Sequence, residues 1–187
     1  MSRFVALVAV FATILLGTAM AHQHPHQNEL HVTRDGAKKA RGGETLYYVF
    51  ALQKCNSSAP WTIHGLWPQY SNDNWPSYCT NTPFDKSLID DLWSEILAYW
   101  DTCSWSGKSE SEFLGHEWTK HGTCSAWDEH GYFSQALNLY TGDSWKSQCD
   151  NQLKEKMKKA TAEGRTFSFS DSECKVAYHN LTMVPRR

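Results

Sequence analysis

The sequence has 187 residues and a formal net charge of −2. Proteins that bind a polyanion over much of their surface are usually strongly basic, so this balance excludes recognition by overall charge and requires a local cluster of cations. Nine tryptophans are present, which supply either a core or platforms for stacking. The length suits one domain with a sizeable core.

The N-terminus has the pattern of a secretory signal peptide. A positive start, an apolar run at 4–16 and small residues flanking Met at 19–21 precede a predicted cleavage point. The apolar run is short for a membrane span, and a retained anchor is the alternative. We expect residues 1–21 to be removed. The mature domain would cover 22–187 and begin with a flexible leader at 22–43.

Six cysteines follow this segment: Cys55, Cys79, Cys103, Cys124, Cys149 and Cys174. An even number behind a signal peptide predicts three disulfides, and no pair has the C-x-x-C spacing of a zinc site. Sequons at Asn56 and Asn180 fit the same route. We expect a secreted, monomeric protein that is not bound to a membrane, with a lysosome or vacuole as another possible compartment.

Two strands are predicted in the first half of the mature chain. Residues 47–53 are aromatic and β-branched, and residues 61–67 form a second such run that Pro68 should end. Strict alternation divides the second strand into two faces. One face holds Thr62, His64 and Leu66, and the other holds Trp61, Ile63 and Trp67.

Helical spacing dominates the rest of the chain. A helix from a Ser87 cap to Trp100 is expected to place its apolar face in the core. That face consists of Leu88, Leu92, Trp93, Ile96, Leu97 and Trp100. A second helix is predicted at 109–121, with Gly122 as its stop. Further helices are predicted at 131–140 and 152–162, and a short strand at 166–170.

The segment 112–124 (EFLGHEWTKHGTC) gathers ionisable side chains. Residues three and four apart are neighbours on a helix, so Glu117, Lys120 and His121 should lie together, with His116 behind Lys120. A carboxylate, a cation and two imidazoles suit acid–base chemistry. A solvated charged face is the alternative.

A zinc-protease site does not fit this segment. That motif needs two histidines at i and i+4, whereas His116 and His121 are five residues apart. Five residues rotate about 140° around a helix, so the two imidazoles diverge. The ammonium of Lys120 would also oppose a metal ion. A zinc-binding module that adds His64 remains a minor alternative.

His64 is a candidate third histidine, although a buried core histidine is the ordinary interpretation. It gains significance if its strand packs beside the 109–121 helix. Cys79 follows the strand and Cys124 follows the helix by three residues. A bridge between these cysteines would tie the two segments together.

The segments WTIHGLWP (61–68) and GHEWTKHGTC (115–124) resemble the two active-site segments of the ribonuclease T2 family, secreted acid ribonucleases that include the plant self-incompatibility ribonucleases. The resemblance covers about half the chain, over 47–139. It implies an α+β fold, in which helices pack on a central, mainly antiparallel sheet in one disulfide-stapled domain. The implied disulfides are Cys55–Cys103, Cys79–Cys124 and Cys149–Cys174.

The resemblance also implies a reaction. Single-stranded RNA would be cleaved by its own 2′-hydroxyl, giving a 2′,3′-cyclic phosphate and then a 3′-phosphate, without a metal or other cofactor. His121 would be the proton acceptor and His64 the proton donor, although the residues alone would allow these roles to be exchanged. Glu117 and Lys120 would steady the phosphorane and His116 would bind phosphate. DNA would not be cut, and the pH optimum would be acidic.

Base recognition and the C-terminal third are less well specified. The resemblance places Trp67, Gln69 and Trp75 at a base site, where aromatic rings stack on RNA bases, while ordinary packing is the alternative for both tryptophans. Residues 140–187 diverge from the family, and the usual helix–strand tail is not recognisable there. A secreted RNA-binding or cytotoxic effector with little catalysis is therefore the competing function.

Overall fold

A computed structural model describes residues 46–70, 74–179 and 181. The predicted signal peptide (1–21), the leader (22–43) and the second sequon at Asn180 lie outside the described residues. Asn56 lies within them and is exposed in the loop after the first strand.

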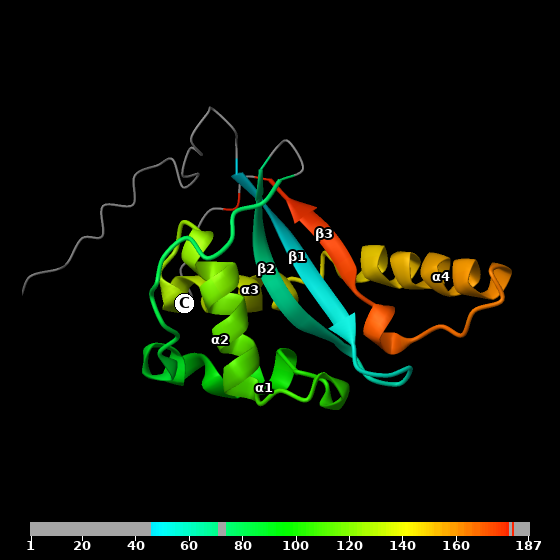
Figure 1. Cartoon of the computed structure of the whole chain (residues 1–187), viewed down its shortest axis with the longest axis horizontal. Coiled ribbons are helices and arrows are strands. Elements are labelled where there is room, and N and C mark those ends of the chain that lie inside the picture. Colours follow the sequence, from blue (N-terminus) through cyan, green and yellow to red (C-terminus); the bar gives the residue numbers. More distant parts are fainter. Residues whose placement is uncertain (1–45, 71–73, 180, 182–187) are drawn as a thin grey trace, which may run out of the picture. The chain divides into compact units, whose positions relative to one another are not determined.

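Three antiparallel strands form the sheet, in the order β2-β1-β3 (Figure 1). They are β1 (Leu46–Lys54), β2 (Trp61–Tyr70) and β3 (Cys174–Tyr178). The first two confirm the predicted strands. The strand predicted at 166–170 is wrong, because this stretch leads into a short 3-10 turn, and the third strand begins only at Cys174.

Strand β2 does not end at Pro68. It continues to Tyr70, and Pro68 pairs with Tyr48 of β1. Proline cannot donate a ladder hydrogen bond, but an edge strand tolerates it. Because β2 lies at the edge of the sheet, the proline does not break it.

A β-bulge interrupts the pairing of β1 with β2. Ala51 pairs with Gly65 and Leu52 pairs with Ile63, which leaves His64 as an extra residue without a partner on β1. A bulge bends its strand and redirects the side chain of the extra residue. His64 therefore does not follow the ordinary alternation of the strand.

Beyond the bulge the two faces of β2 change places. Leu66 pairs with Phe50, so it shares the core-facing side with Ile63 and is fully buried. Trp67 pairs with Val49 and lies on the other face. The predicted faces are wrong for Leu66 and Trp67, because strict alternation does not allow for an inserted residue.

The helix predicted from Ser87 to Trp100 is two helices with a kink. A 3-10 helix spans Lys86–Leu92 and α1 spans Trp93–Tyr99. Ser87 is not the cap, because the Asp85 side chain accepts the hydrogen bond from the Ser87 N–H. Ile89 has non-helical backbone angles (φ −130°, ψ 19°) and is fully buried.

The kink changes which apolar residues face the core. Leu92, Ile96 and Trp100 are buried as predicted, whereas Leu88 and Leu97 are exposed at 54% and 55%. A straight helix would have aligned Leu88 with Leu92, and the non-helical backbone at Ile89 breaks this alignment. Their predicted burial is therefore wrong.

Helix α2 spans Glu110–Lys120 and carries the charged segment. Ser109 caps it, and its backbone N–H donates to the Glu112 carboxylate, which completes a capping box. Gly122 is not a left-handed stop, since its φ is not positive. It begins a further 3-10 turn, and a Cβ there would lie 2.2 Å from the Trp118 ring.

Two further helices complete the described fold. Helix α3 spans Glu129–Thr141 and packs against β2, while α4 spans Lys146–Ala162 and lies beside β3 (Figure 1). Both predicted helices are confirmed, with α4 starting six residues earlier than expected. No helix among the described residues is long and apolar enough to cross a bilayer.

The arrangement is an α+β fold held by three disulfides. The bonded pairs are Cys55–Cys103, Cys79–Cys124 and Cys149–Cys174, the same pairs that the resemblance implied. The second ties the loop after β2 to the end of α2, and the third joins α4 to β3. The fold class predicted from the sequence is confirmed. The C-terminal part, where the sequence showed no recognisable helix–strand tail, contains the helix α4 and the strand β3 of the central sheet.

Candidate active site

One cavity of about 330 Å³ collects the residues that the sequence singled out. It is lined by His64, Trp67, Gln69, Trp75, His116, Glu117, Lys120, His121 and Lys175. All but the last were assigned to catalysis, phosphate binding or base binding from the sequence. Strand β2 and helix α2 therefore deliver their polar groups to one place.

His64 is fixed through its backbone and its ring. Its carbonyl accepts a 3.0 Å hydrogen bond from the Trp100 indole. Its imidazole lies against Phe113, with ring centroids 5.5 Å apart, and meets Trp67 edge to face at 5.2 Å. The side chain keeps 27% exposure, so the ring is held and still reaches the cavity.

Two carboxylates lie beside this ring. Nε2 of His64 is 3.8 Å from Glu117 Oε1, and Nδ1 is 3.0 Å from Glu173 Oε1. The second distance suits a hydrogen bond, but the ring N–H is not aligned with the carboxylate, so the contact is an ion pair. The imidazole thus has a carboxyl group beside each ring nitrogen.

His121 follows α2 as its C-terminal cap, and its N–H donates to the Glu117 carbonyl. Its ring stacks on Trp67 at 5.1 Å and is 6% exposed. Burial lowers its pKa to about 3, and the charges of Lys120, His116 and His64 add to this. The imidazole is therefore neutral at ordinary pH and able to accept a proton.

Glu117 lies below the cavity and is 1% exposed. Its Oε2 accepts a 2.8 Å hydrogen bond from the Trp67 indole. Burial raises its pKa to about 7, although the charge of His64 and the indole hydrogen bond oppose the shift. Gly65 makes room for this contact, because a Cβ there would lie 2.1 Å from Glu117 Oε2 and 2.3 Å from Trp67 Nε1.

Trp67 occupies the centre of the site. Its indole donates to Glu117, stacks on His121 and meets the edge of His64. The ammonium of Lys175 lies 5.0 Å from its ring centroid, which is a cation–π contact. These contacts give Trp67 a positioning role in addition to the predicted base binding.

The other two predicted base-binding residues lie on the open part of the cavity. Trp75 is 59% exposed, so its ring is available for stacking. The side-chain amide of Gln69 donates to the Pro68 carbonyl at 3.0 Å. Its carbonyl oxygen is the group that could read a base edge.

His116 and Lys120 line the cavity as half-exposed side chains. The pKa of His116 is lowered by burial first and then by the charges of Lys108, Lys120 and His64. In the free protein His116 is therefore harder to protonate than an ordinary histidine. A bound phosphate would favour the protonated form that the predicted role needs. The Lys120 carbonyl accepts from the Tyr78 N–H, which docks the loop after β2 onto α2.

Sequence reasoning missed Glu173 and Lys175. They flank Cys174 at the start of β3, and Lys175 lines the cavity while Glu173 contacts His64. The alternation of Cys174, Val176 and Tyr178 with charged or small residues was the available strand signal. Five residues are a weak pattern, and nothing local indicated that this strand reaches the site.

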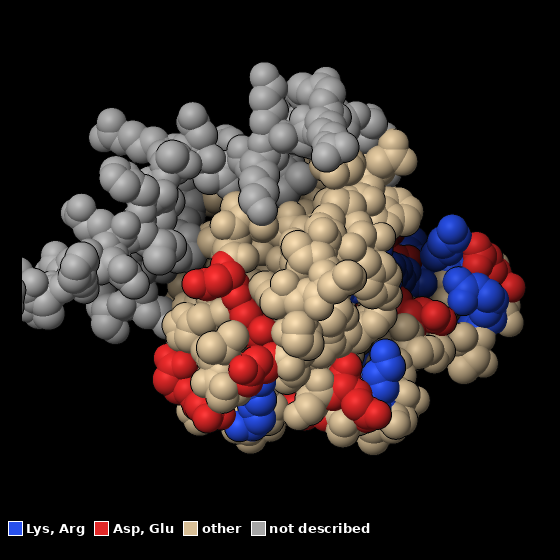
Figure 2. All heavy atoms as spheres, turned by 60° about the vertical axis from the view of Figure 1, so that its left-hand side comes forward, with Lys and Arg blue, Asp and Glu red and all other residues tan. Residues whose placement is uncertain are grey.

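Charge is distributed without a broad basic surface on the face shown in Figure 2, where the described acidic and basic side chains are interspersed among uncharged ones. This agrees with the net charge of −2. The cavity itself is lined by two lysines, Lys120 and Lys175. Within the described residues, no three His, Cys, Asp or Glu side chains are grouped so that they could hold a metal ion.

Comparison with known proteins identifies relatives along most of the described chain. A profile of the Ribonuclease T2 family matches residues 44–161. Ribonuclease 1 of Arabidopsis thaliana is 44% identical over 101 residues, 49% of this chain and 44% of that protein. Ribonuclease T2 of Danio rerio is 30% identical over 148 residues, 74% of this chain and 54% of that protein.

The chain spans about half the length of these relatives. Among solved structures, RNase NT in complex with 5′-AMP has a TM-score of 0.47 and 30% identity, with 62% of each chain covered. The family profile covers more than half of the present sequence and includes β2 and α2, which supply most of the cavity lining. The chain therefore belongs to the ribonuclease T2 family.

Proposed function

We propose that this protein is a secreted endoribonuclease that cleaves single-stranded RNA by transphosphorylation, without a metal or other cofactor. The observation that carries the proposal is the pair of imidazoles, His64 and His121, held on Trp67 in one cavity with Glu117 and Lys120. RNA carries its own nucleophile, so a base, an acid and stabilisation of the phosphoryl charge suffice.

His121 is the proposed base. It takes the proton of the 2′-hydroxyl, and the resulting oxygen attacks the adjacent phosphorus. The low pKa of His121 supports this role, because a neutral imidazole is available at the acidic pH where the other groups are protonated. Burial against Trp67 keeps the ring in one orientation.

His64 is the proposed acid, which donates its proton to the departing 5′-oxygen. The ionised carboxylate of Glu173, 3.0 Å from Nδ1, supports this role, because an anion beside the ring would stabilise the proton donor. Together with the neutral state of His121, this arrangement favours one of the two role assignments that the residues alone left open. Cleavage yields a 2′,3′-cyclic phosphate, which water then converts more slowly to a 3′-phosphate.

The remaining polar groups would stabilise the pentacoordinate phosphorane. Lys120 offers a cation at the cavity, and Glu117, protonated below about pH 7, offers a hydrogen-bond donor to a phosphoryl oxygen. His116 would bind phosphate in its protonated form. Trp75 and Gln69 would bind a base, with Trp67 completing the wall of that site.

The decisive test uses a fluorescent RNA oligonucleotide at pH 5 in excess EDTA. We expect cleavage to continue in EDTA and to yield a 2′,3′-cyclic phosphate, whereas an oligonucleotide with one 2′-deoxy residue should not be cut at that residue. Loss of cleavage in EDTA would instead favour a zinc-dependent activity. If the folded protein binds RNA without cleaving it, the alternative function, a secreted RNA-binding effector with little catalysis, would be favoured.

His121→Phe should lower the cleavage rate at least 10²-fold, because the base is lost while an aromatic ring still stacks on Trp67. The far-ultraviolet circular dichroism of this variant should match the wild type. If it kept most of the activity, the assignment of the base would be wrong.

The pH–rate profile should have its maximum below pH 7. The acid must be protonated and the base neutral. His121 stays neutral down to its pKa of about 3, so the base remains available at acidic pH. A maximum above pH 8 in steady-state assays would contradict this mechanism.

The exposed Asn56 sequon is compatible with glycosylation in the secretory pathway.

A further inference from the structure

Glu173, the residue just before β3, places a carboxylate beside His64, the proposed acid. Glu117 of α2 lies near the other nitrogen of the same ring. Glu173 Oε1 lies 3.0 Å from His64 Nδ1, and its Oε2 lies 3.0 Å from Lys175 Nζ. The carboxylate thus bridges an imidazole and an ammonium. Its side chain is 27% exposed, so water screens these contacts only in part.

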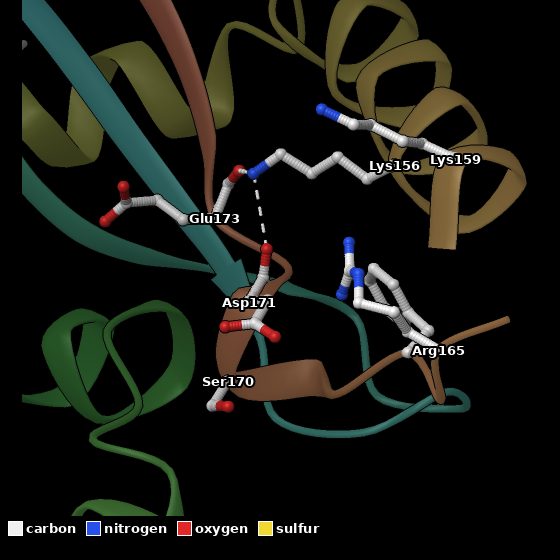
Figure 3. Close-up of a pocket in the computed structure, with 7 residues that line it drawn as sticks. Lys156, Lys159, Arg165, Ser170, Asp171 and Glu173 are labelled. Atoms are coloured by element: carbon white, nitrogen blue, oxygen red, sulfur yellow. Dashed lines mark hydrogen bonds between the residues drawn. The ribbon is translucent and has the colours of Figure 1, made fainter. Parts of the chain in front are cut away.

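The backbone around Glu173 is held firmly to α4. Cys174 is bonded to Cys149 of this helix. Lys156, also on α4, donates to the carbonyls of Asp171 and Glu173. Figure 3 shows a second cavity, whose lining includes Lys156, Lys159 and Arg165. The Lys156 amino group reaches these carbonyls, while the Glu173 carboxylate points away from the three cations. The carboxylate is therefore directed toward the sheet and His64.

A second set of contacts fixes the preceding residue. The Ser172 hydroxyl donates to the Lys54 carbonyl and accepts from the Lys54 N–H at the end of β1. Ser172 is 1% exposed. The segment that carries Glu173 is thus anchored to the central strand as well as to α4. Such anchoring is what a side chain needs if it is to orient another one.

We infer that Glu173 is a positioning residue for His64, which holds the proton on Nδ1 and leaves Nε2 to deliver a proton to the leaving group. The inference rests on the ribonuclease function proposed above. A carboxylate at one ring nitrogen fixes the tautomer and stabilises the imidazolium, as in catalytic triads. The present contact is not aligned as a hydrogen bond, and such contacts commonly tighten when substrate binds.

Charge around His64 makes Glu173 the dominant anion at acidic pH. The titratable groups lining or adjoining this part of the cavity are His116, Glu117, Lys120, His121, Glu173 and Lys175. The pKa of Glu117 is about 7, so it is mostly uncharged at pH 5. Contacts with His64 and Lys175 outweigh the burial of Glu173 and lower its pKa to about 2. Of the two carboxyl groups beside His64, Glu173 is therefore the one that stays ionised at pH 5.

The test compares Glu173→Gln with Glu155→Gln, which removes an exposed carboxylate on α4. We expect Glu173→Gln to lower kcat about 10- to 100-fold with KM within about twofold. The alkaline limb of its pH–rate profile should move about one pH unit lower, because the acid loses its proton more easily. Glu173→Asp should recover part of kcat, and Glu155→Gln should match the wild type.

Two outcomes would overturn the inference. One is an unchanged kcat in Glu173→Gln, and the other is a loss of rate that is the same at every pH, as a merely structural role would give. Circular dichroism of both variants controls for folding.

A measurement without substrate separates this inference from the proposed function. Imidazole resonances of His64 are followed by NMR as pH is varied, and we expect the midpoint to fall in Glu173→Gln and to stay constant in Glu155→Gln. An unchanged midpoint would refute the role of Glu173 even if RNA is cleaved. If the wild type does not cleave RNA, the proposed function fails, and the NMR titration still decides whether Glu173 controls His64.

Discussion

At the scale of single residues, the site depends on a position that has no side chain. Gly65 lies beneath the hydrogen bond between Trp67 and Glu117. Its φ is not positive, so glycine is required here for space and not for backbone conformation. The dipeptide His64-Gly65 thus combines the bulged imidazole with the gap that admits Glu117.

Gly65→Ala should lower kcat at least 10-fold. The added Cβ would lie 2.1 Å from Glu117 Oε2, and neither the buried carboxyl nor the stacked indole can move freely, since overpacking in a filled interior is costly. The matched control is Gly115→Ala on α2, where a Cβ would meet Phe84 at an ordinary 3.6 Å.

The control should keep full activity and gain about 0.5–1 kcal/mol of stability, because alanine favours a helix over glycine. Steady-state kinetics and urea unfolding of the two variants measure these effects. Equal activity of Gly65→Ala and the wild type would show that Glu117 need not occupy its present position.

At the scale of elements, the side chains that line the cavity come from segments that meet only in the folded chain. The bulge of β2 presents His64, α2 presents Glu117 and Lys120, and β3 presents Lys175. The C-terminal part is thus built into the site, and it also completes the sheet. The two disulfides that join these elements each fasten one side of the cavity.

Replacing Cys149 and Cys174 together by serine should lower both stability and kcat. Loss of a native disulfide typically costs about 2–4 kcal/mol, and here it also frees the strand that carries Lys175 and follows Glu173. The control replaces Cys55 and Cys103, which join segments outside the cavity lining.

Both double variants should lose stability in urea, but only the Cys149 and Cys174 variant should lose kcat at temperatures where both remain folded. An equal kcat for the two would indicate that β3 keeps its place without the disulfide.

At the scale of the whole molecule, the ionisable groups of the site make the free energy of unfolding depend on pH. Some of them lower it as pH falls, and Glu117 lowers it as pH rises. The pKa values of Glu173 and His121 are lowered to about 2 and about 3, so their contributions weaken as pH falls. The pKa of Glu117 is raised from 4.5 to about 7, so its burial becomes unfavourable as pH rises through that interval. The active site therefore tends to favour the folded state most in the acidic to neutral range.

Glu173→Gln should be less stable than the wild type by about 1–3 kcal/mol at pH 6, with the difference vanishing near pH 2. Folded Glu173 stays ionised down to about pH 2, whereas the unfolded chain takes up the proton near its ordinary value of 4.5. The stabilisation is thus present above pH 4.5 and is lost between 4.5 and 2. Urea unfolding at several pH values measures this, and a constant difference between pH 6 and pH 2 would contradict it.

The sequence alone determined what depends on local spacing. The i+3 and i+4 relations of Glu117, Lys120 and His121 follow from the geometry of one helix, and the predicted limits of α2 differ from the observed ones by one residue at each end. Both long strands and the fold class were also predictable, since alternation and aromatic content extend over nine or ten residues.

Only the tertiary structure decided what depends on pairing between distant segments. The bulge at His64 is a mismatch between two strands, so neither strand reveals it separately. The kink at Ile89 coincides with a side chain that is fully buried in the core, which the spacing of the segment did not indicate. Glu173 reaches His64 because β3 pairs with β1, a contact across more than a hundred residues that no local pattern encodes. The sequence therefore supplied the reactive groups, while folding decided their charge states and which histidine has an anionic partner.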